Sequence, residues 1–213
     1  MRKGIEMKIA ILCETSGTIR ELMREKGHDV ISCDTLPADD LSPSDGHHWQ
    51  GDAMKFLENS DDGEFDILIA HPPCTALALS GNRWYGQGME KHSKRLEAMQ
   101  WTVDLWNLAK RKARRVAFEN PVGVLGHTEM GKATQYIQPW QFGHTESKRT
   151  GLWLHNLPKL HETDNVKEEF DKLPAKEKHK IWYASPSADR WKVRSKTYIG
   201  IGLGIANQWG ELD

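Results

Sequence analysis

The segment His71-Pro-Pro-Cys74 places a thiol in a stiff turn that directly follows a predicted buried strand at residues 65–70. Two consecutive prolines fix the backbone φ angle and remove two N–H donors, so the turn holds the cysteine in one position. A thiol held in this way can act as a nucleophile if its surroundings lower its pKa toward neutrality. The cysteine of an isolated Pro-Pro-Cys more commonly has a structural role in a tight turn. Whether Cys74 is a nucleophile therefore depends on the polar groups around it.

Glu119 follows another predicted strand, at residues 115–118, and is backed by Asn120 and Pro121. The position of Asn120 before a proline predicts an extended turn rather than a helix. A carboxylate at the end of a buried strand is costly unless water or a partner solvates it. Glu119 therefore suits an acid or a hydrogen-bond partner for a substrate nitrogen, or alternatively a helix cap or an ion pair.

Further polar groups follow the first two predicted strands, at residues 8–13 and 29–33. Asp34 stands where an acidic residue can accept hydrogen bonds from ribose hydroxyls in a nucleotide-binding unit. Asp52 is placed to read the amino group of an adenine, or simply to favour the start of a helix. The turn after the first strand has a single glycine and reads Glu14, Thr15, Ser16, Gly17 and Thr18.

Strands that alternate with helices bring these groups together. Helices are predicted at 18–27, 92–112 and 199–212, a further strand at 150–154, a polar loop at 35–48 and an irregular insert at 155–185. In the longest helix, Leu96, Met99, Val103 and Trp106 form one apolar stripe. The alternation predicts parallel crossover units, and hence an α/β sandwich with a mostly parallel sheet. The carboxyl ends of such strands form a ligand crevice, where we expect the polar groups to converge.

Taken together, Pro73-Cys74, Glu119-Asn120 and the ordered carboxylates Asp34 and Asp52 resemble the cytosine-C5 DNA methyltransferase family. The resemblance extends through Lys148-Arg149 to the terminal helix and so covers nearly the whole chain. It implies one domain over residues 1–213 with a doubly wound, Rossmann-like methyltransferase sandwich. The insert at 155–185 would replace the large recognition domain of the family, as in small stand-alone enzymes of phages.

The resemblance also implies a cofactor and a role for each matching residue. The cofactor would be S-adenosylmethionine, bound by the turn from Glu14 to Thr18 and by Asp34, Asp52 and Pro72. Cys74 would be the nucleophile that attacks C6 of cytosine. Glu119 would hold N3 and the exocyclic amine, and Lys148 or Arg149 would correspond to the basic pair near the cytosine.

Charge is distributed unevenly along the 213 residues. Residues 34–66 carry ten acidic residues and one base, whereas residues 67–213 carry 22 bases and 15 acids. The basic part suits an anionic partner such as nucleic acid, although a solvated surface explains the same charges. Alternating bases near aromatic residues favour contact with the nucleic-acid backbone in the segment with Arg190, Lys192, Arg194 and Lys196.

Several classes of protein are disfavoured. The three cysteines form no C-x-x-C pair, so we expect neither a disulfide framework nor a cysteine zinc site, and we assign Cys13 and Cys33 to the core. Scattered histidines predict no metal site. The polar start and the lack of a long apolar run predict a protein of the cytosol rather than of a membrane.

Three functions stay open at this point. The first is methylation of cytosine in DNA, and the second is the same chemistry on a free cytosine nucleotide, which needs no recognition domain. The third is an inactive homologue that works as a nucleic-acid-binding or interaction module. Methylation of an amino group is disfavoured, because that chemistry typically wants an aromatic residue where this chain has Cys74.

Overall fold

A twisted sheet forms the centre of the protein. The computed structural model describes residues 5–39, 46–180 and 197–212. Within them the strands follow the order β3-β2-β1-β4-β5-β7-β6. Their bounds are β1 Lys8–Leu12, β2 Asp29–Asp34, β3 His48–Gln50, β4 Phe65–Ala70, β5 Ala113–Pro121, β6 Gln135–Ile137 and β7 Thr150–His155. The pairs among β1 to β5 are parallel, whereas β7 runs antiparallel to both β5 and β6.

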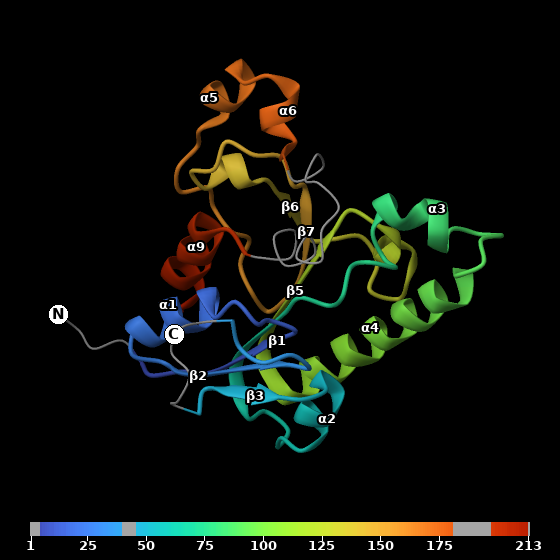
Figure 1. Ribbon diagram of the computed structural model, residues 1–213. Coiled ribbons are helices and arrows are strands. Elements are labelled where there is room, and N and C mark those ends of the chain that lie inside the picture. The colour runs from blue at the N-terminus through green and yellow to red at the C-terminus, as the bar shows by residue number, and fades with distance from the viewer. Residues whose placement is uncertain (1–4, 40–45, 181–196, 213) are drawn as a thin grey trace.

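Helices cover both faces of this sheet (Figure 1). Helices α1 Thr18–Glu25 and α9 Ile199–Trp209 lie side by side on one face, and α2 Ala53–Glu58 and α4 His92–Lys112 pack on the other. Shorter helices are α3 Asn82–Tyr85, α5 Lys167–Lys172 and α6 Ala175–Lys178, with 3-10 turns η1 Leu79–Gly81, η2 Val124–His127 and η3 Pro139–Gln141. The expected doubly wound α/β sandwich with a mostly parallel sheet is confirmed.

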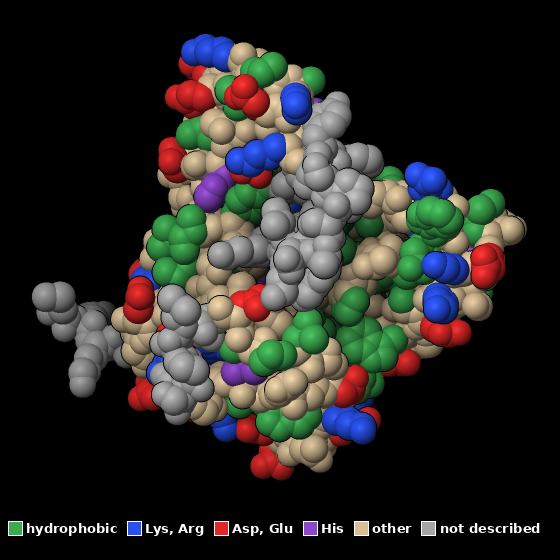
Figure 2. Space-filling model, in the orientation of Figure 1, with side chains coloured by type: hydrophobic (Ala, Val, Ile, Leu, Met, Phe, Trp, Pro, Cys, Tyr) green, Lys and Arg blue, Asp and Glu red, His purple; other side chains and the backbone are tan. Residues whose placement is uncertain are grey.

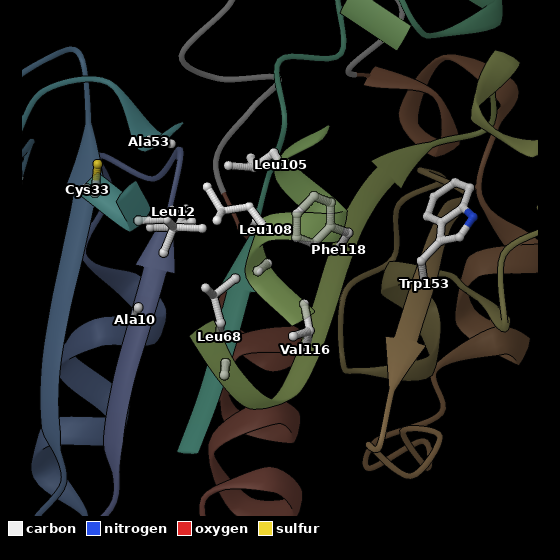
Figure 3. Packing of buried hydrophobic residues seen from close by; sticks show 14 of the residues in the cluster. Ala10, Leu12, Cys33, Ala53, Leu68, Leu105, Leu108, Val116, Phe118 and Trp153 are labelled. Atoms are coloured by element: carbon white, nitrogen blue, oxygen red, sulfur yellow. The ribbon is translucent and has the colours of Figure 1, made fainter. Parts of the chain in front are cut away.

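Alternation of side chains along the strands builds two separate cores. On the α4 face, Leu68 and Phe118 pack with Leu105 and Leu108 of the helix (Figure 3). On the other face, residues of the same strands shifted by one position pack against α1 and α9. Glu119 therefore projects from β5 on the face of α1 and α9, opposite to Phe118.

Three expectations about local structure were wrong. Leu96 was expected to belong to the apolar stripe of α4, but its side chain is 53% exposed. The first turns of the helix extend beyond the sheet, so the sheet does not cover it (Figure 1). The insert at 155–185 is not irregular throughout, since it contains α5 and α6. The turn expected at Glu119 is instead the continuation of β5 to Pro121, because β7 pairs with these residues.

Strands β3 and β6 were not predicted from the sequence. Each has three residues, which is too short for a recognisable alternation of apolar and polar side chains. The helix predicted at 92–112 matches α4. Among the described residues, no helix has the length and apolar character needed to cross a membrane.

Candidate active site

Three buried side-chain atoms have no hydrogen-bond partner within the described part of the chain: Oε2 of Glu14, Nε2 of His71 and Oδ1 of Asn120. Glu14 and His71 follow the ends of β1 and β4, and Asn120 lies near the end of β5. These three strands are neighbours in the sheet. Because buried polar atoms are nearly always paired, three unpaired atoms at one edge of a sheet indicate a site for a polar ligand.

The turn after β4 is bound directly to the end of β5. Nδ1 of His71 lies 3.0 Å from Oε2 of Glu119, and Nδ2 of Asn120 donates to the carbonyl oxygen of Pro72 over 2.8 Å. The N–H of His71 donates to the carbonyl oxygen of Leu12 in β1, over 3.0 Å. These bonds place the turn that leads to Cys74 beside the end of β5, and the convergence of the Cys74 and Glu119 side chains stays a prediction.

Cys74 is half-buried, and its carbonyl oxygen closes the turn that follows. The N–H groups of Leu77 and Ala78 donate to this oxygen over 3.1 and 2.8 Å. The next residues lie against the segment after β5, where a Cβ on Gly123 would collide with the carbonyl oxygen of Leu77. Cys74 thus lies on a turn that is fixed by backbone hydrogen bonds and by close packing against Gly123.

Glu119 is 23% exposed and lies in a mixed electrostatic environment. Burial raises its pKa, but the hydrogen bond from His71 and the positive charge of Lys148 outweigh burial and hold the pKa below its ordinary value of 4.5. The Lys148-Arg149 pair is split, because only Lys148 turns toward Glu119. Arg149 is exposed and its guanidinium carbon lies 4.4 Å from the ring centre of Tyr136.

A small cavity of about 30 Å³ lies between the sheet and α9. Its polar lining comes from the side chains of six residues: His71, Glu119, Lys148, Thr150, Thr197 and Tyr198. Apolar side chains of β4, β7 and α9 line the rest, and Cys74 is not among the described residues that line it. This volume holds one or two water-sized groups, so it suits a ligand's amino or hydroxyl group rather than a whole ring.

The turn after β1 is held by hydrogen bonds within itself and by bonds from its backbone to Cys33 and Asp39. Oε1 of Glu14 accepts hydrogen bonds from the hydroxyl of Ser16 and, over 3.1 Å, from the N–H of Thr18. Gly17 adopts a left-handed conformation, with φ of 67°, at the start of α1. The hydroxyl of Thr15 donates to Asp39 over 3.1 Å. Oε2 of Glu14 stays buried and unpaired, which fits the positively charged amino group of S-adenosylmethionine.

The two remaining predicted cofactor carboxylates lie beside this turn. Oδ1 of Asp34 accepts from the N–H of Leu36 over 2.9 Å, and the side chain stands at the end of β2. Asp52 is the N-cap of α2 and accepts from the N–H of Lys55 over 3.1 Å. The structure therefore gives Asp52 a capping role, and its contact with a cofactor stays a prediction.

Sequence reasoning missed one cluster that lies beside the cavity. Oε2 of Glu146 accepts a hydrogen bond from the hydroxyl of Tyr198, and its Oε1 forms an ion pair with Nζ of Lys180. Each of these two distances is 2.5 Å. Burial and the bond to Glu146 raise the pKa of Tyr198. Lys148 lies 6.0 Å from the centre of the Tyr198 ring. These residues are far apart in the sequence and follow no motif, so no local signal could have identified them.

An exposed aromatic surface follows the turn with Cys74 and was also missed. Trp84 in α3 is 54% exposed, with Arg83 4.8 Å and Lys91 5.9 Å from its ring centre. Leu79 and Met89 are exposed nearby in the sequence. Figure 2 shows hydrophobic side chains bordered by Lys and Arg over α3 and the start of α4. The adjacent Arg83-Trp84 pair was the signal available in the sequence.

The last predicted group, Arg190, Lys192, Arg194 and Lys196, lies outside the described residues. In the part of the chain that the structure describes, no group of three or more His, Cys, Asp or Glu side chains is placed to hold a metal ion.

No family model matches the chain, and no curated protein matches it. Solved structures with a similar fold include the S. pombe Dnmt2 methyltransferase, with 12% identity and a TM-score of 0.45, covering 97% of this chain and 66% of that one. The Entamoeba histolytica methyltransferase EhMeth has 10% identity and a TM-score of 0.43, with 76% and 58% covered. The bifunctional kinase-methyltransferase WbdD has 9% identity and a TM-score of 0.44, with 74% and 39% covered.

The chain thus spans less than two thirds of each of these three proteins. Similarities of this size do not assign the chain to a family. Its function is therefore inferred from its own residues.

Proposed function

We propose that this protein transfers a methyl group from S-adenosylmethionine to C5 of cytosine in DNA, through a covalent adduct with Cys74. The observation that carries the proposal is the set of unpaired polar atoms of Glu14, His71 and Asn120 on neighbouring strand ends. Cys74 follows the same strand end as His71, and Glu119 precedes Asn120 in β5, which supports placing the reaction at this edge. One edge of the sheet therefore offers an acceptor for a cationic cofactor, a thiol and a carboxylate.

The residues after β1 and β2 fit the cofactor. Glu14 would hold its amino group through Oε2, and Asp34 would accept hydrogen bonds from its ribose hydroxyls. When bound, S-adenosylmethionine supplies an electrophilic methyl group on a positively charged sulfur. Glu14 is already fixed by Ser16 and Thr18, so binding would require little reorganisation of this turn.

The chemistry of cytosine explains why a thiol and a carboxylate are both needed. C5 is a poor nucleophile, and attack of the Cys74 thiolate at C6 forms an S–C6 bond and makes C5 enamine-like. Glu119, ionised at neutral pH, accepts a hydrogen bond from the 4-amino group and favours a proton on N3, which takes up the electron pair displaced by the attack. After the methyl group passes to C5 and the neutral thioether leaves, water would take the C5 proton, and the electron pair of that C–H bond would form the C5=C6 bond as the S–C6 bond breaks. The Cys74 thiolate is then free, and loss of the N3 proton to water restores the ring.

The exposed surface around Trp84 supports a polymer rather than a free nucleotide as substrate. Aromatic rings beside cations stack on unpaired bases and contact the backbone of single strands. A base in a duplex would have to leave the stack, at a cost of a few kcal/mol. Trp84 follows Cys74 by ten residues, and we infer that it holds the strand next to the reacting base.

One experiment separates the candidate functions. The protein is incubated with radiolabelled S-adenosylmethionine and, in parallel, with single-stranded DNA, duplex DNA or a mixture of cytosine nucleotides, and the nucleosides are analysed. Label in 5-methyl-2′-deoxycytidine from DNA supports the proposal. Label only in the free nucleotides favours the nucleotide enzyme, and binding of DNA without any transfer favours the binding module.

The variant Trp84→Ala tests whether the substrate is a DNA strand rather than a free nucleotide. We expect it to raise the KM for single-stranded DNA by about tenfold, the loss expected for one stacked base. The KM for a cytosine nucleotide should stay unchanged. Trp84→Phe keeps a ring, so its KM for single-stranded DNA should lie between those of the native protein and Trp84→Ala. Ile5→Ala, which removes an exposed side chain elsewhere, should leave this KM unchanged. An equal KM for DNA in Trp84→Ala and the native protein would remove this surface from the proposal.

A further inference from the structure

His71 has one nitrogen in use and one without a partner. Its backbone is fixed to β1 by the hydrogen bond to Leu12, and its Nδ1 is fixed by Glu119 at 3.0 Å. The side chain is 13% exposed and lines the small cavity together with Glu119. Nε2 is buried and makes no hydrogen bond to any described residue. The ring is therefore held in a fixed orientation with its second nitrogen available to a ligand.

The partner of Nδ1 determines what Nε2 can do. Glu119 is ionised at neutral pH, because His71 and Lys148 hold its pKa below the ordinary value despite burial. A carboxylate only accepts hydrogen bonds, so the proton of a neutral His71 ring must sit on Nδ1. In this neutral form of the ring, Nε2 carries a lone pair and is a hydrogen-bond acceptor. Glu119 and the neutral form of His71, which both line the cavity, then offer two acceptors.

The other charged and polar groups around the cavity do not fill this acceptor. Lys148 acts on Glu119 through its charge, and its Nζ lies 6.0 Å from the ring centre of Tyr198. The hydroxyl of Tyr198 is donated to Glu146, and that of Thr150 lies within reach of the carbonyl oxygen of Lys148, at 3.1 Å, and of Glu119. Among the described residues no donor satisfies Nε2, so a ligand can supply one.

We propose that His71 contacts the substrate and that its Nε2 and Glu119 together recognise the exocyclic amino group of the base. This inference rests on the proposed function and adds a residue that selects the substrate. An amino group carries two N–H donors, one for each acceptor, and it matches the size of the cavity. Uracil and thymine present an oxygen at the same position, and that oxygen would face two acceptors and gain no hydrogen bond. The pair thus admits cytosine and rejects 4-oxo pyrimidines.

Two substitutions separate the two nitrogens of the ring. The amide of Asn lies where Nδ1 lies in His, so His71→Asn keeps a donor for Glu119 and loses the acceptor in the cavity. The amide of Gln reaches the position of Nε2, so His71→Gln keeps an acceptor in the cavity and loses the donor for Glu119. Both variants keep a polar side chain, and thermal unfolding of each verifies that the fold is intact.

The test compares two thymine oligonucleotides that differ only in a central cytosine or a central uracil. We expect the native protein to bind the cytosine strand at least tenfold more tightly, because a site built to accept a donor rejects an analogue without it. In His71→Asn this ratio should fall below threefold, and in His71→Gln it should stay near the native value. A native ratio near one, or a His71→Asn ratio equal to the native ratio, would overturn the proposal.

Two further measurements keep this result separate from the proposed function. The ¹⁵N spectrum of the native protein at neutral pH should show the His71 proton on Nδ1, and a proton on Nε2 would contradict the inference. The binding ratio needs no methyl transfer. Loss of cytosine preference in His71→Asn without any transfer in the native protein would uphold the role of His71 and refute the methyltransferase. If the native protein methylates cytosine and His71→Asn keeps the native preference for cytosine, the methyltransferase is upheld and the role of His71 is refuted.

Discussion

Two parts of the same sheet edge are built in opposite ways. In the turn after β1, the side chain of Glu14 is held by hydrogen bonds between residues two to four apart, while the backbone is also bonded to Cys33 and Asp39. The edge formed by the turn after β4 and the end of β5 is closed by bonds between residues 48 apart, from His71 to Glu119 and from Asn120 to Pro72. Both leave buried polar atoms unpaired.

The difference indicates a division of labour. A locally closed turn keeps its shape when the rest of the edge moves, and this suits a cofactor that binds to preformed backbone and one carboxylate. An edge joined across two strands depends on the packing of the whole sheet, and this fixes a thiol and a carboxylate relative to each other. Substitutions in the two parts should therefore have separate effects on chemistry and on cofactor binding.

The substitution Cys74→Ala should have the largest effect and the sharpest contrast between the two parts. We expect methyl transfer to fall by at least about a thousandfold, because the nucleophile is lost. Affinity for S-adenosylmethionine, measured by calorimetry, should stay within twofold of the native value. Thr75→Ala, at an exposed neighbour on the same turn, is the control. Turnover that survives in Cys74→Ala would exclude the covalent mechanism.

The substitution Glu119→Gln should lower turnover by about a hundredfold, within the range of a lost general acid or base. Gln keeps the acceptor for His71 but cannot carry the negative charge that favours a proton on N3. Glu129→Gln, at an exposed position, should leave turnover unchanged. A loss of less than twofold in Glu119→Gln would remove Glu119 from the chemistry.

The same variant has a predicted effect on stability against acid. The pKa of Glu119 is lower in the folded protein than its ordinary value of 4.5, so its ionisation stabilises the fold above that value. This stabilisation disappears as the pH falls through the lowered pKa. Glu119→Gln should therefore unfold at a lower temperature than the native protein at pH 7, and the gap should narrow below about pH 4.5. A gap that is independent of pH would contradict the assigned pKa direction.

The substitution Glu14→Gln probes the first part of the edge. Gln keeps an acceptor for Ser16 and Thr18 but removes the charge at the unpaired oxygen, so affinity for S-adenosylmethionine should fall by about tenfold. Cytosine preference in the binding assay should not change. Glu25→Gln, at an exposed position at the end of α1, serves as the matched control. Unchanged cofactor affinity in Glu14→Gln would separate this turn from the cofactor.

The same contrast explains how much of the structure the sequence could predict. Apolar runs that form strands, and polar residues at the ends of those strands, are local features of the sequence. The crossover fold was therefore predicted correctly, and Glu14, Asp34 and Cys74 lie at or just after strand ends as expected. The extension of β5 through Glu119 was not, because it depends on pairing with β7, more than thirty residues away in the chain. Leu96 followed the helical period, yet the sheet ends before it.

The partners of functional residues were the least predictable feature. His71 belongs to the same motif as Cys74, but its role depends on Glu119, and nothing near His71 in the sequence identifies that partner. The same holds for Tyr198 and Glu146. A side-chain pair across two strands requires the register of the sheet, which local periodicity does not contain.

The smallest expected effect comes from Asp52, which separates a structural carboxylate from a binding one. Its side chain caps α2, so Asp52→Ala should lower the free energy of unfolding by about 1 kcal/mol. Asp52→Asn keeps a good cap and should stay within a few tenths of a kcal/mol of the native protein. If capping is the whole role of Asp52, neither variant changes cofactor affinity once folded, and Asp34→Asn weakens it at nearly native stability. A cofactor affinity that falls equally in Asp52→Ala and Asp34→Asn would instead extend the cofactor site to the start of α2.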